Sequence, residues 1–224
     1  MQDKEICVKV LAFRMVQIVV AWTCLIGLSA CSKGLTWSED VRLPDGRIVT
    51  LKRQVEFAGP AGGLGEERTE SRQRIEFKSP ISGESVVWQN ERPNAMLRVV
   101  ALWTEGGRIR MLTSPLYVGD EFRVNCPNPP YLVQEYVSGQ WRPVPWGQVP
   151  RLAIRANATT KPLEARALIE QSRHHLTAEQ TSNSFFMLSG VFKVPYVVHL
   201  DPAIQQTFGN QNCYRDRNYL IRKE

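Results

Sequence analysis

Histidine and cysteine are scarce in this chain, which has three histidines and five cysteines among its 224 residues. His174 and His175 are neighbours, so on a helix their side chains diverge by about 100° and cannot hold one metal ion on a single face. His199 is expected in a strand. Neither Cys126 nor Cys213 has a second Cys or a His at the short spacing typical of zinc sites. We therefore expect no metal site and no cofactor.

The familiar catalytic motifs are also missing. The glycine-rich run 59–65 lacks the lysine and the Ser or Thr that complete a phosphate-binding loop. Ser85 follows Gly83 by two residues, but the second glycine of a nucleophile elbow is absent. We therefore expect no enzyme. One alternative stays open, because two scattered carboxylates could meet in the folded chain and act as acid and base, as in glycosidases.

No lysine-rich block is present, although the chain carries 28 Lys and Arg against 22 Asp and Glu, a net charge of +6. The excess is spread thinly along the sequence. Nucleic-acid binding would need a concentrated basic face, so we expect no nucleic-acid partner. The mild positive charge is compatible with attraction to anionic polymers of a cell envelope.

Charge is absent from Met15 to Ala30, an apolar run that follows a charged opening with a slight basic excess. As a helix this run would cover about 24 Å, which is short of the roughly 30 Å hydrocarbon core of a bilayer. A basic opening, a short apolar middle and a small-residue end are typical of a secretory signal peptide. We expect residues 1–30 to be cleaved. The alternative is an uncleaved signal anchor.

The end of this run, Leu28-Ser29-Ala30-Cys31, resembles the lipobox of bacterial lipoproteins. The resemblance implies cleavage before Cys31, acylation of its sulfur with a chain such as palmitate, and acylation of the new amino terminus. One acyl chain anchors a protein only marginally, whereas two or three hold it on a membrane. Ser32 follows the cysteine in place of the Asp that favours the inner membrane, so the resemblance implies an outer-membrane protein facing the periplasm.

The cysteines that would remain after processing form a single pair. Cys7 and Cys24 lie in the leader, and Cys31 would be blocked by its lipid. An exported compartment is oxidising, so we expect a disulfide between Cys126 and Cys213, closing a loop of 88 residues. In the chain-entropy account such a bridge is worth about 4–5 kcal/mol. The alternative is two buried free thiols.

Short apolar runs separated by Gly, Pro and Asx turns dominate the rest of the chain. After a polar tether over 31–40, the turn Pro44-Asp45-Gly46 predicts a hairpin. In the following run, 47–57, apolar residues alternate on one face and are interrupted only by Arg53. Residues 58–71 are rich in Gly and Glu and predict a flexible loop.

Regular strand patterns follow from Arg72 to Val144, and then the periodicity changes. The run 161–176 contains no glycine and has Pro162 near its first turn, so it predicts the main helix. Thr177 and Gln180 have the spacing of a capping box. We therefore expect one mainly β (α+β) domain over 41–224, with an antiparallel sheet, sandwich or barrel-like architecture.

Four aromatic residues near several prolines are a candidate binding surface: Tyr131, Tyr136, Trp141 and Trp146. Aromatic faces stack on sugar rings and on peptide partners. A small β domain also needs large aromatic residues in its core, so core packing is the competing interpretation.

The sequence thus predicts a lipid-anchored envelope protein with a structural or assembly role. Its partners would be the membrane, through the lipid, and another envelope protein or peptidoglycan. The competing hypothesis is a periplasmic hydrolase acting on an envelope polymer. A pocket with two close carboxylates, one of them buried, would favour the hydrolase.

Overall fold

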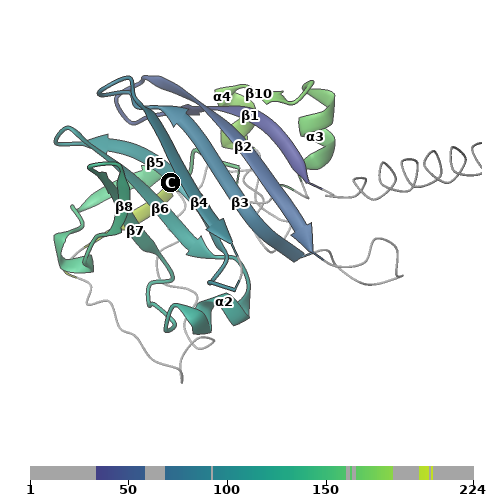
Figure 1. Cartoon of the computed structure of the whole chain (residues 1–224). Coiled ribbons are helices and arrows are strands. Elements are labelled where there is room, and N and C mark those ends of the chain that lie inside the picture. The colour runs from purple at the N-terminus through teal and green to yellow at the C-terminus, as the bar shows by residue number, and fades with distance from the viewer. Residues whose placement is uncertain are drawn as a thin grey trace, which may run out of the picture. The chain divides into compact units, whose positions relative to one another are not determined.

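The computed structural model describes residues 34–58, 69–91, 93–159, 162, 165–183, 197–201 and 203 (Figure 1). The expected signal peptide, Cys31 and Cys213 therefore lie outside the described residues. None of the described helices is long and apolar enough to cross a membrane.

Most of the described chain is strand. The strands are β1 (Leu35–Arg42), β2 (Ile48–Ala58), β3 (Thr69–Lys78), β4 (Ser85–Glu91), β5 (Leu97–Glu105), β6 (Arg108–Pro115), β7 (Leu132–Val137), β8 (Gln140–Pro143), β9 (Leu152–Arg155), β10 (His175–Leu176) and β11 (Val197–Leu200). The helices are short: α2 (Val118–Arg123), the 3₁₀ turn η1 (Trp146–Gln148), α3 (Arg166–Gln171) and α4 (Ala178–Asn183).

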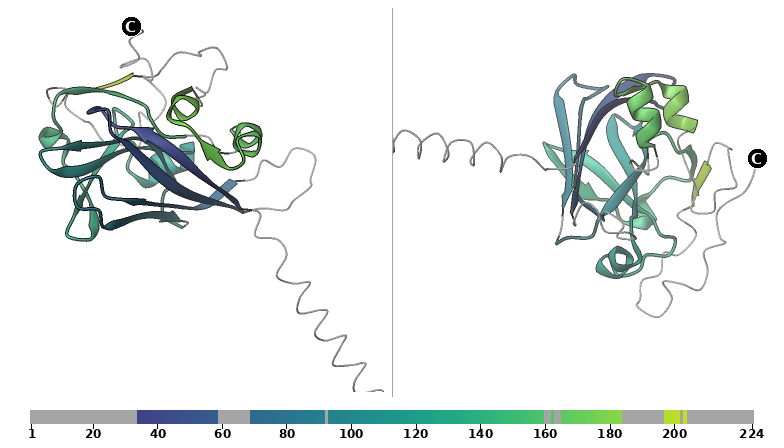
Figure 2. Two further views of the ribbon diagram at one scale, coloured as in Figure 1. Left: turned by 90° about the horizontal axis from the view of Figure 1, so that it is seen from above. Right: turned by 90° about the vertical axis from the view of Figure 1, so that its right-hand side faces the viewer.

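These strands form two main sheets and one small one. The five-stranded sheet has the order β10-β1-β2-β3-β4, the four-stranded sheet the order β5-β6-β7-β8, and β11 pairs with β9. All pairs are antiparallel except β1 with β10. The mainly β architecture expected from the sequence is confirmed. Figure 2 shows the sheets from two further directions, with α3 and α4 beside β1.

Alternating side chains build the core between the two main sheets. In β2, Val49 and Leu51 are buried while Ile48, Thr50 and Lys52 are exposed. They join apolar residues of the facing sheet, such as Leu102 and Met111, in one cluster. Burial of this apolar surface is the main favourable contribution to folding. A second cluster lies on the other face of the four-stranded sheet, where β9 and β11 cover it.

Polar side chains join the two main sheets along both of their edges. On one side Asn157 donates from Nδ2 to the carbonyls of Arg42 (3.0 Å) and Leu102 (2.8 Å). It also accepts the N–H of Leu102 (2.9 Å). On the other side the Trp141 indole donates to the carbonyl of Val87 (2.9 Å). The backbone groups of Arg42, Leu102 and Val87 therefore have side-chain hydrogen-bond partners where the two sheets meet.

Two boundary predictions are corrected by the structure. The tether expected over 31–40 is wrong from Leu35 onward, because β1 begins there and pairs with β2 along its whole length. Its alternate side chains, Leu35 and Trp37 among them, are buried. The expected loop 58–71 is also shorter, since β2 reaches Ala58 and β3 begins at Thr69.

The expected helix over 161–176 is present but much shorter, because α3 covers only Arg166–Gln171. Arg173 and His174 have positive φ values of 52° and 62°. Their N–H groups donate to the carbonyls of Glu170 and Ile169, which is the Schellman arrangement that ends helices. The chain then leaves as β10, parallel to β1. Glycine normally occupies the left-handed position that ends a helix. The run 161–176 contains no glycine, so its sequence predicted one continuous helix.

Candidate functional site

A buried ion pair lies on the inward face of the five-stranded sheet. Arg53 of β2 and Glu39 of β1 are 2% and 0% exposed, and their Nη1 and Oε1 atoms are 2.8 Å apart. The register places Arg53 opposite Trp37, so the ion pair is diagonal across the two strands. Burying two charges is costly unless each is paired and hydrogen-bonded.

The pair meets that condition through Trp37 and Thr159. The Trp37 indole N–H donates to Glu39 Oε2 (2.9 Å), and the Thr159 N–H donates to Glu39 Oε1 (3.2 Å). Arg53 donates to the Thr159 carbonyl (2.6 Å), and its guanidinium lies 4.9 Å from the Trp37 ring centre. Both Glu39 oxygens are therefore engaged by donors of the protein itself.

A second buried carboxyl, Glu70, lies at the start of β3. It is 4% exposed, and Gln73 donates a side-chain hydrogen bond to it. Burial raises its pKa to about 7, although the nearby charges of Arg53 and Arg98 and the bond from Gln73 act in the opposite direction. Its backbone N–H donates to the Tyr117 hydroxyl (3.2 Å). Glu70 thus exchanges its proton near neutral pH.

Glu39 and Glu70 are two buried carboxyls among the described residues, and their contacts decide whether they could act as a base and an acid. Glu70 has the raised pKa of a general acid. A general base must reach a water molecule or a substrate, and the Glu39 oxygens are bonded instead to Arg53, Trp37 and Thr159. The contacts of Glu39 are better suited to holding β1, β2 and the segment that contains Thr159 together than to hydrolysis.

The four aromatic residues of the candidate binding surface do not form one surface. Tyr136 and Trp141 contact each other with ring centres 5.4 Å apart, and both pack on the core between the main sheets. Tyr131 and Trp146 are buried in the cluster on the other face of the four-stranded sheet. All four contribute to the cores, as the competing interpretation expects.

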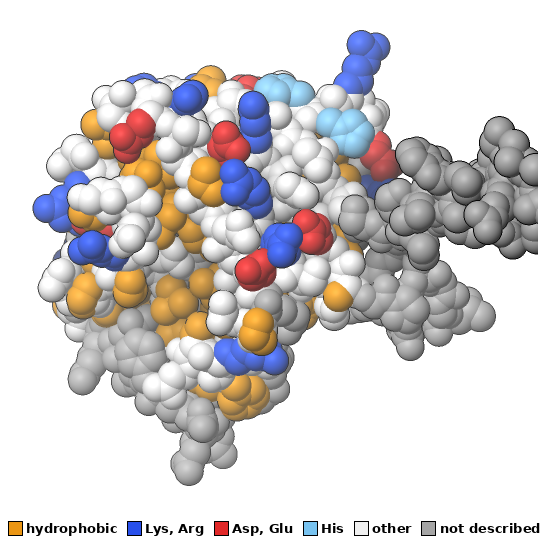
Figure 3. Space-filling model, viewed as in Figure 1, with side chains coloured by type: hydrophobic (Ala, Val, Ile, Leu, Met, Phe, Trp, Pro, Cys, Tyr) orange, Lys and Arg blue, Asp and Glu red, His pale blue; other side chains and the backbone are white. Residues whose placement is uncertain are grey.

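An open groove lies on the outer face of the five-stranded sheet. It has a volume of about 460 Å³ and is lined mainly by Ile48, Thr50, Lys52, Glu76, Lys78, Pro80 and Ser85. These residues come from β2, β3, β4 and the turn between β3 and β4. Figure 3 shows charged side chains of both signs over this part of the molecule, and hydrophobic side chains gathered toward β6 and β7.

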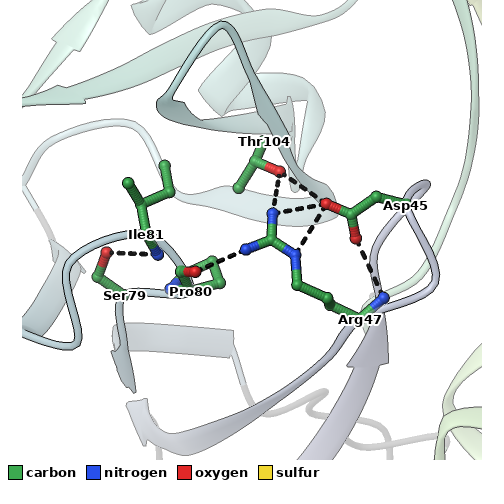
Figure 4. A network of polar contacts seen from close by, with 6 residues as sticks. All are labelled: Asp45, Arg47, Ser79, Pro80, Ile81 and Thr104. Atoms are coloured by element: carbon green, nitrogen blue, oxygen red, sulfur yellow. Dashed lines mark hydrogen bonds and ion pairs between the residues drawn. The ribbon is translucent and has the colours of Figure 1, made fainter.

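The turn at one end of the groove is fixed by Arg47 (Figure 4). Its guanidinium donates to Asp45, to the Pro80 carbonyl (2.6 Å) and to the Thr104 hydroxyl (2.9 Å). The hydrogen bond from the Arg47 side chain lowers the pKa of Asp45 to about 2. Beside it, the Ser79 hydroxyl accepts the N–H of Ile81 (3.2 Å). One arginine therefore joins the β1–β2 turn, the β3–β4 turn and the facing sheet.

His174 and His175 contact different residues of β1. His174 Nδ1 lies 3.0 Å from the Thr36 carbonyl, and His175 Nε2 lies 3.3 Å from Asp40 Oδ2. His199 is in β11, and its side chain lies outside the described part of the structure. Within the described ranges no group of His, Cys, Asp and Glu is arranged to hold a metal ion.

The cysteine predictions fall mainly outside the described residues. Cys126 is buried just after α2. Its expected partner Cys213 and the expected lipidation site Cys31 lie in parts of the chain that are not described. Both the disulfide and the lipid anchor remain predictions.

Sequence reasoning did not identify Glu39, Arg53 and Glu70 as one site. Glu39 and Arg53 stand where strand alternation demands an apolar residue, and that was the available signal. Glu70 lies three residues before the buried Gln73, beyond a register shift between β2 and β3, so alternation does not predict its burial. Arg53 interrupts the apolar face of β2, and Glu39 falls between Trp37 and Val41 on the apolar face of β1. Charged residues at inward positions mark a buried polar cluster.

Comparison with models of protein families, with curated proteins and with solved structures found no match to this chain.

Proposed function

We propose that this chain is a lipid-anchored protein of a bacterial cell envelope, held by Cys31 in the outer membrane and facing the periplasm. Its role is that of a non-enzymatic accessory, and it binds another envelope component through the groove on the five-stranded sheet. The observation that carries the binding role is the groove of about 460 Å³, open to solvent and bordered by a fixed turn.

The start of β1 limits how far the domain can lie from the membrane. Only Ser32, Lys33 and Gly34 separate Cys31 from Leu35. Fully extended, this link reaches about 14 Å between the Cα atoms of Cys31 and Leu35. A lipid on Cys31 would therefore hold the end of the sheet at which β1 begins close to the bilayer.

A periplasmic hydrolase is the second candidate, and Glu70 is the observation that favours it. A buried carboxyl with a pKa near 7 suits a general acid. The bonds that engage both oxygens of Glu39 argue against this carboxylate as its base. Release of soluble fragments from purified envelope polymers, lost on Glu70→Gln, would establish the hydrolase instead.

The anchor is tested by replacing Cys31 with Ala in the full chain. We expect the wild-type protein in the membrane fraction, labelled by an alkyne analogue of palmitate. The Cys31→Ala protein should carry no label and leave the membrane or stay uncleaved. A variant that remains processed, labelled and membrane-bound would contradict the anchor.

The accessory role is tested by photo-crosslinking in living cells. Ile48 lines the groove and is 52% exposed, so a photoreactive residue there should capture a specific envelope component. Phe122 on α2 is similarly exposed at 43% and serves as the matched control. Identical adducts at both positions, or none at Ile48, would contradict binding through the groove.

A further inference from the structure

We propose that the groove binds the carboxylate groups of peptidoglycan stem peptides through Lys52 and Lys78. This inference rests on the proposed envelope location, and it names the partner of the groove.

Both lysines among the described residues line this one groove. Lys52 lies opposite Glu76 in the β2–β3 register, so Lys78, two residues further along β3, is its diagonal neighbour on the same face. Diagonal neighbours are about 7–8 Å apart, a distance that long side chains can span. Both side chains are exposed, and no ion pair joins either lysine to a described residue. Two ammonium groups are therefore available to one anionic partner.

The single carboxylate in the groove does not neutralise them. Glu76 Oε2 lies 3.3 Å from Arg74 Nη2, and Glu76 Oε1 accepts from the Ser85 hydroxyl (3.4 Å). Arg74 balances the charge of Glu76, so the net positive charge of the groove comes from the two lysines. Complementary charge of this kind selects the partner and steers its approach more than it adds affinity.

The groove also offers apolar contact in a fixed shape. Ile48 is half exposed and Pro80 lies at the rim, so an extended chain could pack its methyl groups against them. Arg47 holds Pro80 in place through the carbonyl and ties that turn to Thr104. A rim that is rigid before binding loses little entropy on binding.

The position of the groove favours a polymer over the lipid headgroups of the anchoring membrane. In the β1–β2 pair, Leu35 lies opposite Val55 and Arg42 lies opposite Ile48. The groove begins at Ile48, seven strand residues from the end at which β1 starts, which corresponds to about 23 Å. A lipid on Cys31 would hold that end near the bilayer and leave the Ile48 end of the groove toward the periplasm. Lys52 lies nearer the held end, three strand residues or about 10 Å from it.

The experiment is co-sedimentation of the purified full-length protein, in mild detergent, with insoluble peptidoglycan sacculi. We expect the wild-type protein to pellet with sacculi and to be released by 0.5 M salt. Two exposed ion pairs are worth little each, so Lys52→Gln with Lys78→Gln should raise the apparent Kd about tenfold. Arg142→Gln removes one exposed positive charge from the four-stranded sheet and should leave the Kd within about twofold.

Two further binding measurements identify which chemical groups the protein recognises. Sacculi whose carboxylates have been converted to neutral amides should lose the protein to the same extent as the double lysine variant. Anionic phosphatidylglycerol added to the micelles should not displace the protein from sacculi. Circular dichroism of each variant should match the wild type, since all three positions are exposed.

Equal binding by the double lysine variant or by neutralised sacculi would overturn the inference, and so would displacement by the lipid. Pelleting no greater than without sacculi would overturn it as well. The Cys31→Ala protein should bind sacculi as the wild type does. Failure of the membrane anchor and failure of this site therefore give separate results.

Discussion

At the scale of single residues, the most consequential feature is a set of charges inside an apolar core. Arg53 and Glu39 neutralise each other, and Trp37 and Thr159 add hydrogen bonds to the pair. A charge of this kind is tolerated only with its partner, because an unpaired buried ion loses its hydration without compensation.

Replacing Arg53 with Met should destabilise the protein by about 3–5 kcal/mol, since Glu39 is then left buried without its counter-ion. Urea unfolding followed by tryptophan fluorescence measures the change. The double variant Arg53→Met with Glu39→Leu should recover much of the loss, because it removes both charges. A single variant that unfolds at the wild-type urea concentration would contradict the role of the pair.

Glu70 should make stability fall as the pH rises from about 4.5 to about 7. Its pKa is raised in the folded protein, so over this interval the folded chain keeps a proton that the unfolded chain has lost. The difference corresponds to about 3 kcal/mol at most. Glu70→Gln should remove this slope and be more stable than wild type at pH 8, whereas an unchanged slope would contradict the assignment.

At the scale of elements, the strands were predictable and the helix length was not. Alternation of apolar residues and the turn Pro44-Asp45-Gly46 indicated the β1–β2 hairpin, which the structure confirms. The capping box is also confirmed, because Thr177 N–H donates to Gln180 Oε1 (2.9 Å) and Gln180 N–H donates to Thr177 Oγ1 (3.3 Å). Local spacing determines both features.

The features that the sequence did not reveal depend on contacts between distant residues. Arg173 adopts a left-handed conformation that only the Schellman arrangement and pairing of β10 with β1 explain. Arg53 interrupts the apolar pattern of β2 in the sequence, but its pairing with Glu39 depends on the register of β1 and β2. The groove likewise depends on the β2–β3 register that brings Lys52 near Lys78.

Asn157 joins the two sheets, and Asn157→Ala should therefore cost about 2–4 kcal/mol. The substitution leaves the N–H and carbonyl of Leu102 and the carbonyl of Arg42 without their partner, and unsatisfied buried polar groups cost about 1–3 kcal/mol each. Thermal unfolding measures the effect. Asn94→Ala in an exposed turn is the control and should change stability by less than about 0.5 kcal/mol; equal effects would contradict the role of Asn157.

At the scale of the whole molecule, the proposed anchor and the groove lie toward opposite ends of the five-stranded sheet. Chain connectivity places the proposed anchor beside the start of β1. The groove lies toward the opposite end of the same sheet, where Arg47 fixes the turns. The membrane and the partner would then occupy different ends of one rigid sandwich, so both could be held at once.

The disulfide between Cys126 and Cys213 is a prediction at this scale, because it would tie the last residues of the chain to the segment after α2. Denatured, unreduced protein should resist a thiol reagent at both positions, and prior reduction should expose both. Reduction should also lower stability by about 4–5 kcal/mol, from the loop-closure estimate. Labelling of both cysteines without reduction would contradict the bridge.

The proposed lipid anchor on Cys31 can be read from the amino-terminal peptide of the mature protein by mass spectrometry. The protein should be isolated from the membrane fraction of its own cells. We expect the mature chain to begin at Cys31 and to carry two or three acyl chains, with no peptide from residues 1–30 attached. A chain that still begins within residues 1–30, or an unmodified Cys31, would contradict it.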